Sequence, residues 1–479
     1  MNYRMICRCL GMLLLCLAAL LLLPFAVGLF YGENVSNFAI CIVLSALAGF
    51  GLSRVRPVRS ALYAREGFVI VALAWLLISL VGALPFVLSG SIPHYLDAFF
   101  ETVSGFTTTG SSVIGNMETM PRGDLFWRQF THWIGGMGVL VFVMAVLPLS
   151  QEHSMHIMRA EVPGPVVGKL VPQMRKTARI LYCIYIAMTL LQTLLLLFGG
   201  LNLYDALLHA FATAGTGGFS TYAASVGHFD SVYVEMVCAV FMLLFSVNFN
   251  LYFFLLIGKP LAILKNEELR VFAGIVLGFT LLIALGIAPM YGSIGQGLRH
   301  AFFNVSAVIS TTGFGTVDFV TWPEYTKWLL LLLMFCGACA GSTGGGMKVS
   351  RVIVLGKTAL AELRRAARPR SVTRVRLEGQ GVSAEGIHTI LVFFGLYIAL
   401  ILGFAFVVSF DGYDITTSFT AALTCLSNVG PGMGLIGPTG NFSIFSPLSK
   451  LALSFAMLLG RLEIYPMLIL LSRRTWRRG

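Results

Sequence analysis

Long apolar segments separated by short polar loops recur along the whole chain. A hydrocarbon core about 30 Å thick requires roughly 20 apolar residues per helical span, and segments of this length run from one end of the sequence to the other. We predict ten spanning helices, at residues 10–30, 36–53, 67–89, 130–149, 178–200, 232–257, 270–290, 326–356, 387–409 and 447–471. Because alternating period-2 strands do not recur, the pattern predicts an all-α polytopic membrane protein and not an outer-membrane barrel.

Each of the last four helix pairs encloses a short apolar stretch that is followed by a cluster of Thr, Ser, Gly and Asn. At about 12–15 residues the stretch is too short to span, so we interpret it as a re-entrant segment that enters the membrane and returns on the same side. The four segments read DAFFETVSGFTTTGS (97–111), YDALLHAFATAGTGGF (204–219), RHAFFNVSAVISTTGFG (299–315) and TTSFTAALTCLSNVGPG (416–432). Aligned on Gly110, Gly217, Gly313 and Gly430, they are separated by 107, 96 and 117 residues, which indicates an internal repeat.

The repeat predicts an architecture of four pseudo-symmetric helix–P-loop–helix units around one pore, after an extra N-terminal helix pair. The predicted divisions are residues 1–60 for the helix pair, 61–155, 156–262 and 263–378 for the first three repeats, and 379–479 for the fourth. The third repeat is expected to contain an intramembrane gating loop.

Composition and charge agree with a membrane protein. Hydrophobic residues make up 57% of the chain and charged residues 11%, whereas soluble domains carry about a quarter charged residues. The net charge of +12 resides in alternate loops and at the C-terminal end, which by the positive-inside rule predicts that both termini are cytoplasmic. The basic clusters are Arg54, Arg56, Arg59 and Arg65; Arg175, Lys176 and Arg179; Lys259, Lys265 and Arg270; residues 364–376; and Arg473, Arg474, Arg477 and Arg478. They are not interleaved with a base-reading motif, so binding to nucleic acid is not predicted.

The four re-entrant segments suggest a cation pathway. Non-helical backbone at membrane depth is tolerated when it is buried in protein or lines a water-filled cavity. Four such segments around an axis would direct their carbonyl oxygens at one line and replace the hydration shell of a cation. Glycine permits the left-handed backbone angles that this needs, Thr residues at 107–109 and 311–312 add hydroxyl oxygens, and each preceding short helix points its partial negative end at the cavity. The alternative is four tight helix-packing turns, which the fourfold register disfavours.

A second irregular element, CGACAGSTGGGMKVSR at 336–351, lies inside the predicted helix 326–356 and should break it about halfway. It is not a phosphate-binding P-loop, because Lys348 follows Met347 and Val349 stands where Ser or Thr is required. We interpret it as a flexible loop beneath the filter that can obstruct the path, which makes it a candidate gate. A glycine hinge with no gating role is the alternative.

Arg461 lies in the middle of a predicted span, within LLGRLEIYPM. A cation at that depth costs about 2.5–3.5 kcal/mol on insertion scales, so we expect it to face the protein interior or water. Near a cation path it would repel ions and limit flux, but a structural ion pair or a carbonyl-capping role is equally compatible with the sequence. Glu463 is two residues further on and therefore lies on another helix face.

The four loops, together with HWIGGMGVLVF (132–142), GSTGGGMKVSR (341–351) and GRLEIYP (460–466), resemble the Trk/Ktr/HKT superfamily of potassium transporters, in particular its bacterial TrkH/TrkG branch. The resemblance extends over essentially the whole chain. It implies a pore-forming subunit of the bacterial inner membrane that transports K+ and carries no organic cofactor. It also implies a homodimer that associates with a TrkA-like cytoplasmic ring of nucleotide-binding regulatory subunits.

Carried over residue by residue, the resemblance assigns a filter, a gate and a pore-facing arginine. The filter would use Thr108, Thr109, Gly110, Gly215, Thr216, Gly217, Thr311, Thr312, Gly313, Asn428, Val429 and Gly430; the gate would use Gly341, Ser342, Thr343, Gly344, Gly345, Gly346 and Lys348; and Arg461 would face the pore. Family members with Ser at the first filter glycine favour sodium, and the four glycines here therefore predict potassium. Gly215 departs from the hydroxyl residue expected there, which puts a side-chain contribution from that quadrant in doubt.

The sequence therefore predicts potassium uptake through a single-file pore and no enzymatic activity. A sodium-selective or H+/Na+-coupled transporter on the same fold is the first alternative. A membrane-embedded enzyme is a second, although the sequence contains no His/Cys/Asp cluster, no nucleophile elbow and no intact nucleotide loop. The basic segment 364–376 could bind the regulatory subunit or anionic lipid headgroups.

Overall fold

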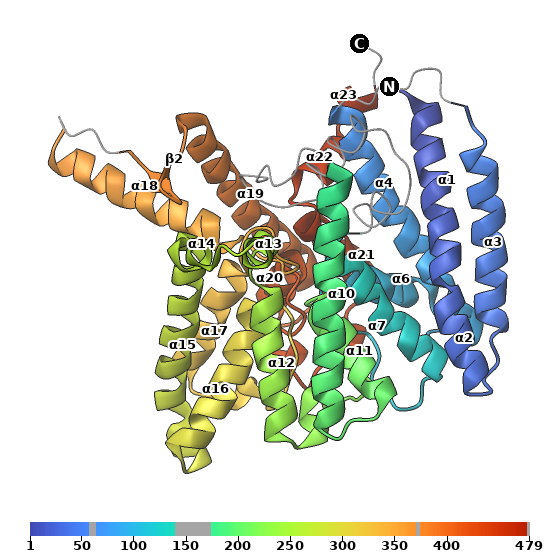
Figure 1. Cartoon of the computed structure of the whole chain (residues 1–479), viewed down its shortest axis with the longest axis horizontal. Coiled ribbons are helices and arrows are strands. Elements are labelled where there is room, and N and C mark those ends of the chain that lie inside the picture. The colour runs from blue at the N-terminus through green and yellow to red at the C-terminus, as the bar shows by residue number, and fades with distance from the viewer. Residues whose placement is uncertain (57–63, 139–173, 370–373, 477–479) are drawn as a thin grey trace.

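The computed structural model describes residues 1–56, 64–138, 174–369 and 374–476, and it is almost entirely helical (Figure 1). Among these residues, strands are confined to one antiparallel hairpin, β1 (Arg376–Leu377) and β2 (Gln380–Gly381). The predicted all-α polytopic class is confirmed.

The N-terminal pair packs along one edge of the bundle (Figure 1). Its first span is formed by α1 (Tyr3–Leu20) and α2 (Leu22–Phe30) together, and its second span is α3 (Ser36–Ser53). Glycines bring α1 and α3 into close contact, since a Cβ placed on Gly11 would lie 2.5 Å from the Ser53 amide nitrogen. Tyr3 at the start of α1 stacks on Trp476 in the last helix, α23 (Arg473–Trp476), so the first and last helices meet at the same end of the bundle.

Four units follow, each with a long outer helix, a short buried helix and a second helix that returns. Their helices are α4 (Ala64–Gly82), α5 (Leu84–Ser89), α6 (Tyr95–Phe106) and α7 (Arg122–Gly136); α10 (Met174–Phe198), α11 (Leu203–Ala214), α12 (Val232–Phe245), α13 (Phe249–Leu256) and α14 (Pro260–Lys265); α15 (Glu267–Tyr291), α16 (Ile294–Ile309), α17 (Glu324–Cys336) and α18 (Val349–Ala367); α19 (Ala384–Val408), α20 (Ile415–Ser427), α21 (Pro447–Arg461) and α22 (Tyr465–Leu471). Short 3-10 turns lie at Ser225–Phe229, Phe319–Thr321, Ser409–Asp411, Gly434–Ile436 and Phe442–Ile444.

The returning helices of the second, third and fourth units are broken near their middle, and the sequence predicted one of these three breaks. The run of glycines does separate α17 from α18, as expected. The continuous spans predicted at 232–257 and 447–471 are wrong, because α12 and α13 meet at a bend of 91° and α21 ends at Arg461, four residues before α22 begins. The side chain of Asn248 starts α13 by accepting from Asn250 N, and Glu463 and Ile464 adopt positive φ angles of 55° and 69°.

These breaks explain why fewer uninterrupted spans are present than predicted. Among the described residues, six helices are long and apolar enough to cross a membrane, or seven if the bent pair α12–α13 is counted as one span, compared with the ten predicted. The predicted span 130–149 begins earlier, at Arg122, and its part after residue 138 lies outside the described residues. Other predicted features also lie outside the described residues, namely the divisions at residues 60 and 155, the basic residues Arg59, Arg477 and Arg478, and part of the segment 364–376. The remaining divisions between repeats stay predictions.

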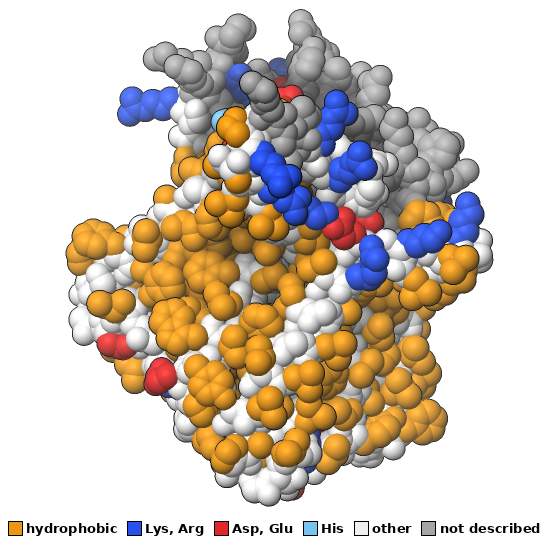
Figure 2. All heavy atoms as spheres, turned by 90° about the vertical axis from the view of Figure 1, so that its left-hand side faces the viewer, with side chains coloured by type: hydrophobic (Ala, Val, Ile, Leu, Met, Phe, Trp, Pro, Cys, Tyr) orange, Lys and Arg blue, Asp and Glu red, His pale blue; other side chains and the backbone are white. Residues whose placement is uncertain are grey.

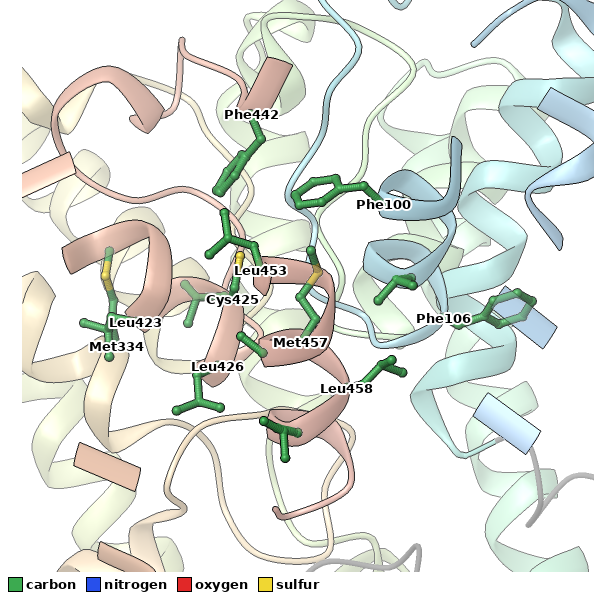
Figure 3. Packing of buried hydrophobic residues seen from close by; sticks show 14 of the residues in the cluster. Phe100, Phe106, Met334, Leu423, Cys425, Leu426, Phe442, Leu453, Met457 and Leu458 are labelled. Carbon is green, nitrogen blue, oxygen red and sulfur yellow. The ribbon is translucent and has the colours of Figure 1, made fainter. Parts of the chain in front are cut away.

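The short helices of the four units form the centre of the core. In α20, for example, all residues from Thr420 to Ser427 are buried. Phe100 and Phe106 of α6 lie in the same apolar cluster as Leu453 and Met457 of α21 (Figure 3). The outer helices α15 and α19 are largely exposed, with buried shares of 33% and 22%, whereas 61% of the outer span of the first unit, Arg65–Ser89, is buried. Figure 2 shows apolar side chains over most of this outer face and Lys and Arg side chains gathered towards one end, as expected for a membrane-embedded surface with basic loops at one boundary.

Candidate functional site

The loops that follow α6, α11, α16 and α20 share one backbone conformation. In each, a non-glycine residue occupies the left-handed region, which L-residues rarely adopt. These residues are Thr108 (φ 56°), Thr216 (φ 56°), Thr311 (φ 59°) and Asn428 (φ 54°). Two positions later each loop has a glycine with positive φ, namely Gly110 (85°), Gly218 (75°), Gly313 (77°) and Gly430 (101°).

Hydrogen bonds confirm that these positions are equivalent. In each loop the amide between the two left-handed residues donates to the carbonyl oxygen five residues earlier. The bonds are Thr109 N to Ser104 O (2.9 Å), Gly217 N to Ala212 O (2.8 Å), Thr312 N to Ala307 O (2.9 Å) and Val429 N to Thr424 O (2.9 Å). The predicted alignment of the second repeat on Gly217 is therefore wrong by one residue. Gly218 takes the place of Gly110, and Thr216, Gly217 and Gly218 form the equivalent triplet.

The four glycines close the loops into a ring. A Cβ placed on any of them would strike the carbonyl oxygen of the middle triplet residue in the next loop. The contacts are Gly110 to Gly217 O (2.1 Å), Gly218 to Thr312 O (1.9 Å), Gly313 to Val429 O (2.1 Å) and Gly430 to Thr109 O (2.8 Å). Each loop thus packs on its neighbour through main-chain atoms, and glycine is required both by this contact and by the left-handed angle.

Side chains of the loops mostly bond to one another or to the loop beneath. Thr109 Oγ1 lies 2.8 Å from Thr107 Oγ1, and in the third loop Thr312 Oγ1 lies 2.7 Å from Ser310 Oγ. Asn428 links the fourth loop to the first, because its Nδ2 donates to Thr109 Oγ1 at 2.9 Å. The Oγ1 of Thr311 accepts from Gly345 N at 2.6 Å, which ties the ring to the glycine-rich segment between α17 and α18.

That glycine-rich segment lies directly beneath the third and fourth loops. A Cβ on Gly344 would be 2.9 Å from Ser310 O, and one on Gly345 would be 2.3 Å from Ser427 O. The chain turns through left-handed angles at Gly337, Gly341, Gly346 and Lys348. Lys348 closes the segment on itself, since its Nζ donates to Gly344 O.

Arg461, at the end of α21, fastens this segment to the opposite side of the bundle. Its Nη1 donates to Thr343 O at 2.7 Å, and its Nη2 donates to Gly135 O and Gly136 O at 2.6 and 2.7 Å. A cavity of about 80 Å³ beside it is lined by the glycine-rich segment, by Lys348 and by Arg461. Arg461 therefore caps carbonyl groups of α7 and of the segment while it lies next to the space below the ring.

A second cavity, of about 130 Å³, lies on the other side of the ring and is lined by Gly110, Gly218, Gly313 and Gly430. The ring of glycine loops thus separates two cavities, and one of them is bounded by a basic, glycine-rich segment.

Comparison with known proteins agrees with this arrangement. The profile of the TrkH family, described as cation transport proteins, matches residues 32–477. The chain is 35% identical over its full length to the Trk system potassium uptake protein TrkH of Escherichia coli K12, and all of that protein is covered. It is 33% identical to TrkG of the same organism, with 99% of each chain covered. The chain belongs to the TrkH family.

The fold agrees as well. The crystal structure of the potassium transporter TrkH from Vibrio parahaemolyticus superposes on the whole chain with a TM-score of 0.90 at 33% sequence identity, and all of both chains is covered. The resemblance to the TrkH/TrkG branch that the motifs indicated is thereby confirmed.

Two ion-pair networks of this TrkH-family chain were not predicted. Above the ring, Arg128 of α7 is buried against Glu101 of α6 at 2.6 Å and donates to Ser220 O at 3.1 Å. Glu101 also accepts from Ser112 Oγ and Val113 N, both at 2.9 Å. The pair therefore holds the chain that leaves the first loop to the chain that leaves the second. Arg128 and Glu101 are far apart in the sequence, and no local pattern marks them as partners.

Below the ring, carboxylates hold the ends of the glycine-rich segment. Glu268 of α15 accepts from Ala340 N at 2.8 Å and from Ser350 N at 2.9 Å, one on each side of the segment. Glu463 pairs with Arg351 of α18 at 2.6 Å. The position of the segment thus depends on Glu268, which the sequence did not single out, and on Glu463, which the sequence marked only as lying on another helix face from Arg461.

Proposed function

We propose that this protein is the pore-forming subunit of a bacterial potassium uptake system, in which K+ passes in single file through the ring of four loops. The observation that carries the proposal is the closed main-chain ring, in which four equivalent triplets contact one another around one axis. Such a ring presents carbonyl oxygens in place of a hydration shell. The relatives named above are potassium uptake proteins.

We assign the filter residues by the structural register, which supports one triplet from each loop. They are Thr108, Thr109 and Gly110; Thr216, Gly217 and Gly218; Thr311, Thr312 and Gly313; and Asn428, Val429 and Gly430. With this register, Thr216 takes the position of Thr108, which supports a hydroxyl residue at the first filter position of the second loop. Four glycines at the third triplet position favour K+ over Na+, and the C-terminal ends of four helices at the ring favour a cation electrostatically.

The glycine-rich segment with Arg461 would act as the gate. Its proposed residues are Gly341, Ser342, Thr343, Gly344, Gly345, Gly346 and Lys348, and all of them except Thr343 line the cavity beneath the ring. The Arg461 guanidinium adds a positive charge there and holds the segment through Thr343 O. Opening would require the segment to break its contacts with Ser427 and Arg461. Each charge-assisted hydrogen bond that breaks costs about 1.5–3 kcal/mol.

Family membership supports a proposal for regulation and assembly. We extend to this chain a location in the bacterial inner membrane with both termini cytoplasmic, a homodimeric state, and association with a TrkA-like cytoplasmic ring of nucleotide-binding subunits. The described cytoplasmic elements that could receive such a partner are α18 and the β1–β2 hairpin. The hairpin reaches the gate region through Glu378, which caps the first two residues of α15.

Uptake of radioactive Rb+ into proteoliposomes tests the function. The purified protein should take up Rb+, K+ should compete and Na+ should not. Gly313→Ser should lose that discrimination, because it adds a side chain at a left-handed position of the ring. Equal competition by Na+ would favour the sodium-selective or cation-coupled alternative. If no Rb+ flux appears under any gradient or with any cytoplasmic partner, the four loops are packing turns and the pore proposal fails.

A further inference from the structure

The second loop lacks the side chains that lie behind the first and third loops. In the first loop Thr107 and Thr109 face each other through their hydroxyls, and in the third loop Ser310 and Thr312 do the same. The equivalent residues of the second loop are both glycine, Gly215 and Gly217. The ring therefore has one quadrant in which the loop itself supplies no packing at these two positions.

These two glycines are not required by their backbone angles. Gly215 has a φ of −71°, and Gly217 has a backbone conformation that L-residues adopt. Gly218, by contrast, has a φ of 75° and would be strained with any other residue. A lack of space for a side chain must therefore explain why residues 215 and 217 are glycine.

His132 of α7 occupies that space. A Cβ on Gly217 would lie 2.3 Å from the Cγ and Nδ1 atoms of the His132 ring and 2.5 Å from its Cδ2 atom. A Cβ on Gly215 would lie 2.3 Å from the His132 main-chain oxygen. The ring of His132 is fully buried and packs on Phe219, just past the second triplet, with 4.0 Å between ring centroids.

The orientation of His132 is set from the first repeat. Its Nδ1 donates to Gly105 O in the last turn of α6 at 2.8 Å, while its Nε2 has no hydrogen-bond partner among the described residues. One side chain thus contacts the helix that ends at the first loop and fills the space behind the second loop.

We propose that His132 is a positioning residue of the filter, which replaces in the second quadrant the hydroxyl pairs that support the first and third. The inference rests on the proposed function, because the ring must be the filter for its support to matter for selectivity. The packing of the His132 ring and the absence of a side chain at residue 217 depend on each other, because both concern the same space. A pair of substitutions should therefore compensate each other at 217 and not at 215.

The experiment is a double-mutant cycle of Gly217→Ala and His132→Ala, read out by K+ over Na+ competition for Rb+ uptake and by thermal unfolding in detergent. Gly217→Ala alone should lower the discrimination about tenfold, the effect of an overpacked site. Adding His132→Ala should recover most of it, because the atoms that the new Cβ strikes are removed. Rescue of selectivity separates positioning from general stabilisation. His132→Ala alone should lower the discrimination as well as the stability, because it empties the space behind the second loop that the Cβ of Ala at residue 217 refills in the double variant.

Two controls make the cycle specific. Gly215→Ala should not be rescued by His132→Ala, because the clashing atom is the main-chain oxygen that alanine keeps. Gly217→Ala should not be rescued by Met457→Ala, which removes another buried side chain of the core. The inference is overturned if Gly217→Ala alone keeps wild-type discrimination, or if the double variant is no better than Gly217→Ala. A wild-type protein without K+ selectivity would instead overturn the proposed function, so the two failures are distinguishable.

Discussion

The ring of four loops and the described helices below it differ in how closely the repeated units resemble one another. In the ring, four stretches with different sequences adopt one conformation, with left-handed residues at matching positions and the same hydrogen bond five residues back. Below the ring, the returning helices differ. The second unit bends by 91° at residues 246–248, the third has a glycine-rich segment of twelve residues between α17 and α18, and the fourth breaks after Arg461.

This difference indicates where the pseudo-symmetry is required. Four loops can close a ring only if each presents the same main-chain surface to the next, so every quadrant must keep a glycine at the contact. Within the part of the chain that the structure describes, no such closure lies below the ring, and one unit can supply the glycine-rich segment while another supplies the arginine that holds it. The comparison predicts that substitutions in the ring change selectivity, whereas substitutions below it change flux at constant selectivity.

The largest effect is expected from Gly218→Ala. The new Cβ would lie 1.9 Å from Thr312 O at a residue whose φ is 75°. Neither the clash with a main-chain atom nor the left-handed angle can be relieved by a small shift, so K+-selective Rb+ uptake should fall by about a hundredfold or more. The measurement is Rb+ uptake in the presence of competing K+ or Na+.

The matched control is Gly356→Ala in α18, where a Cβ would meet nothing within 4 Å among the described residues. This variant should keep wild-type flux, and its stability should be unchanged or slightly higher because alanine favours a helix. Wild-type selectivity in Gly218→Ala would contradict the ring as the selective element.

The next effect in size is expected from Arg461→Gln. This change removes the positive charge beside the lower cavity and weakens the bonds to Thr343 O, Gly135 O and Gly136 O. The segment should leave its closed position more often, and the basal Rb+ flux should rise about 3- to 30-fold, equivalent to losing part of a charge-assisted interaction. K+ over Na+ discrimination should stay at the wild-type value. A loss of discrimination would break the distinction between the ring and the helices below it.

The same division shows how much the sequence could predict. The helix Ser36–Ser53 has the predicted bounds, and the four re-entrant segments were recognisable because Gly, Thr and Ser interrupt apolar sequence in four places. The break between α17 and α18 was predictable because Gly344, Gly345 and Gly346 are consecutive. In these places local chemistry departs visibly from that of an apolar helix.

Where local chemistry was ambiguous, prediction failed. The second loop contains both Gly217 and Gly218, so alignment on a glycine had two solutions, and alignment on Thr216 would have chosen correctly. The break at Glu463 and Ile464 has no glycine to mark it. The partnership of Arg128 with Glu101 depends on how α6 and α7 pack, which no sequence spacing reveals.

A smaller change in flux is expected from Glu268→Gln. The carboxylate accepts from Ala340 N and Ser350 N on either side of the glycine-rich segment. The amide oxygen of glutamine can still accept, but without charge, and charge-assisted bonds are roughly twice as strong as neutral ones. Basal Rb+ flux should rise about 2- to 5-fold with unchanged selectivity. The exposed pair Arg365–Glu362 provides the control, and Glu362→Gln should leave flux unaltered because surface ion pairs contribute little. Equal effects of the two variants would argue against a role for Glu268 in holding the segment.

The smallest effect concerns the far ends of the short helices, where the fourfold equivalence ends. Side chains of Asn202, Ser293 and Asp414 cap α11, α16 and α20, whereas His94 makes no side-chain capping bond among the described residues. Asp414 accepts from Thr417 N at 3.2 Å, and its contacts with Thr417 hold its pKa below the ordinary value. Asp414→Ala should therefore destabilise the protein by about 1 kcal/mol with unchanged selectivity.

The pH dependence of that cap has a definite sign. Because the folded protein favours the charged carboxylate, the stabilisation is complete above the ordinary Asp pKa of about 3.9 and is lost as the pH falls from there towards the folded-state pKa. The difference in thermal unfolding temperature between wild type and Asp414→Ala should be constant near neutral pH and shrink below about pH 4. Asp414→Asn, which caps without a charge, should lack this dependence. If Asp414→Ala changed the discrimination between K+ and Na+, the helix ends remote from the ring would also have to be equivalent. The symmetric region would then extend beyond the loops.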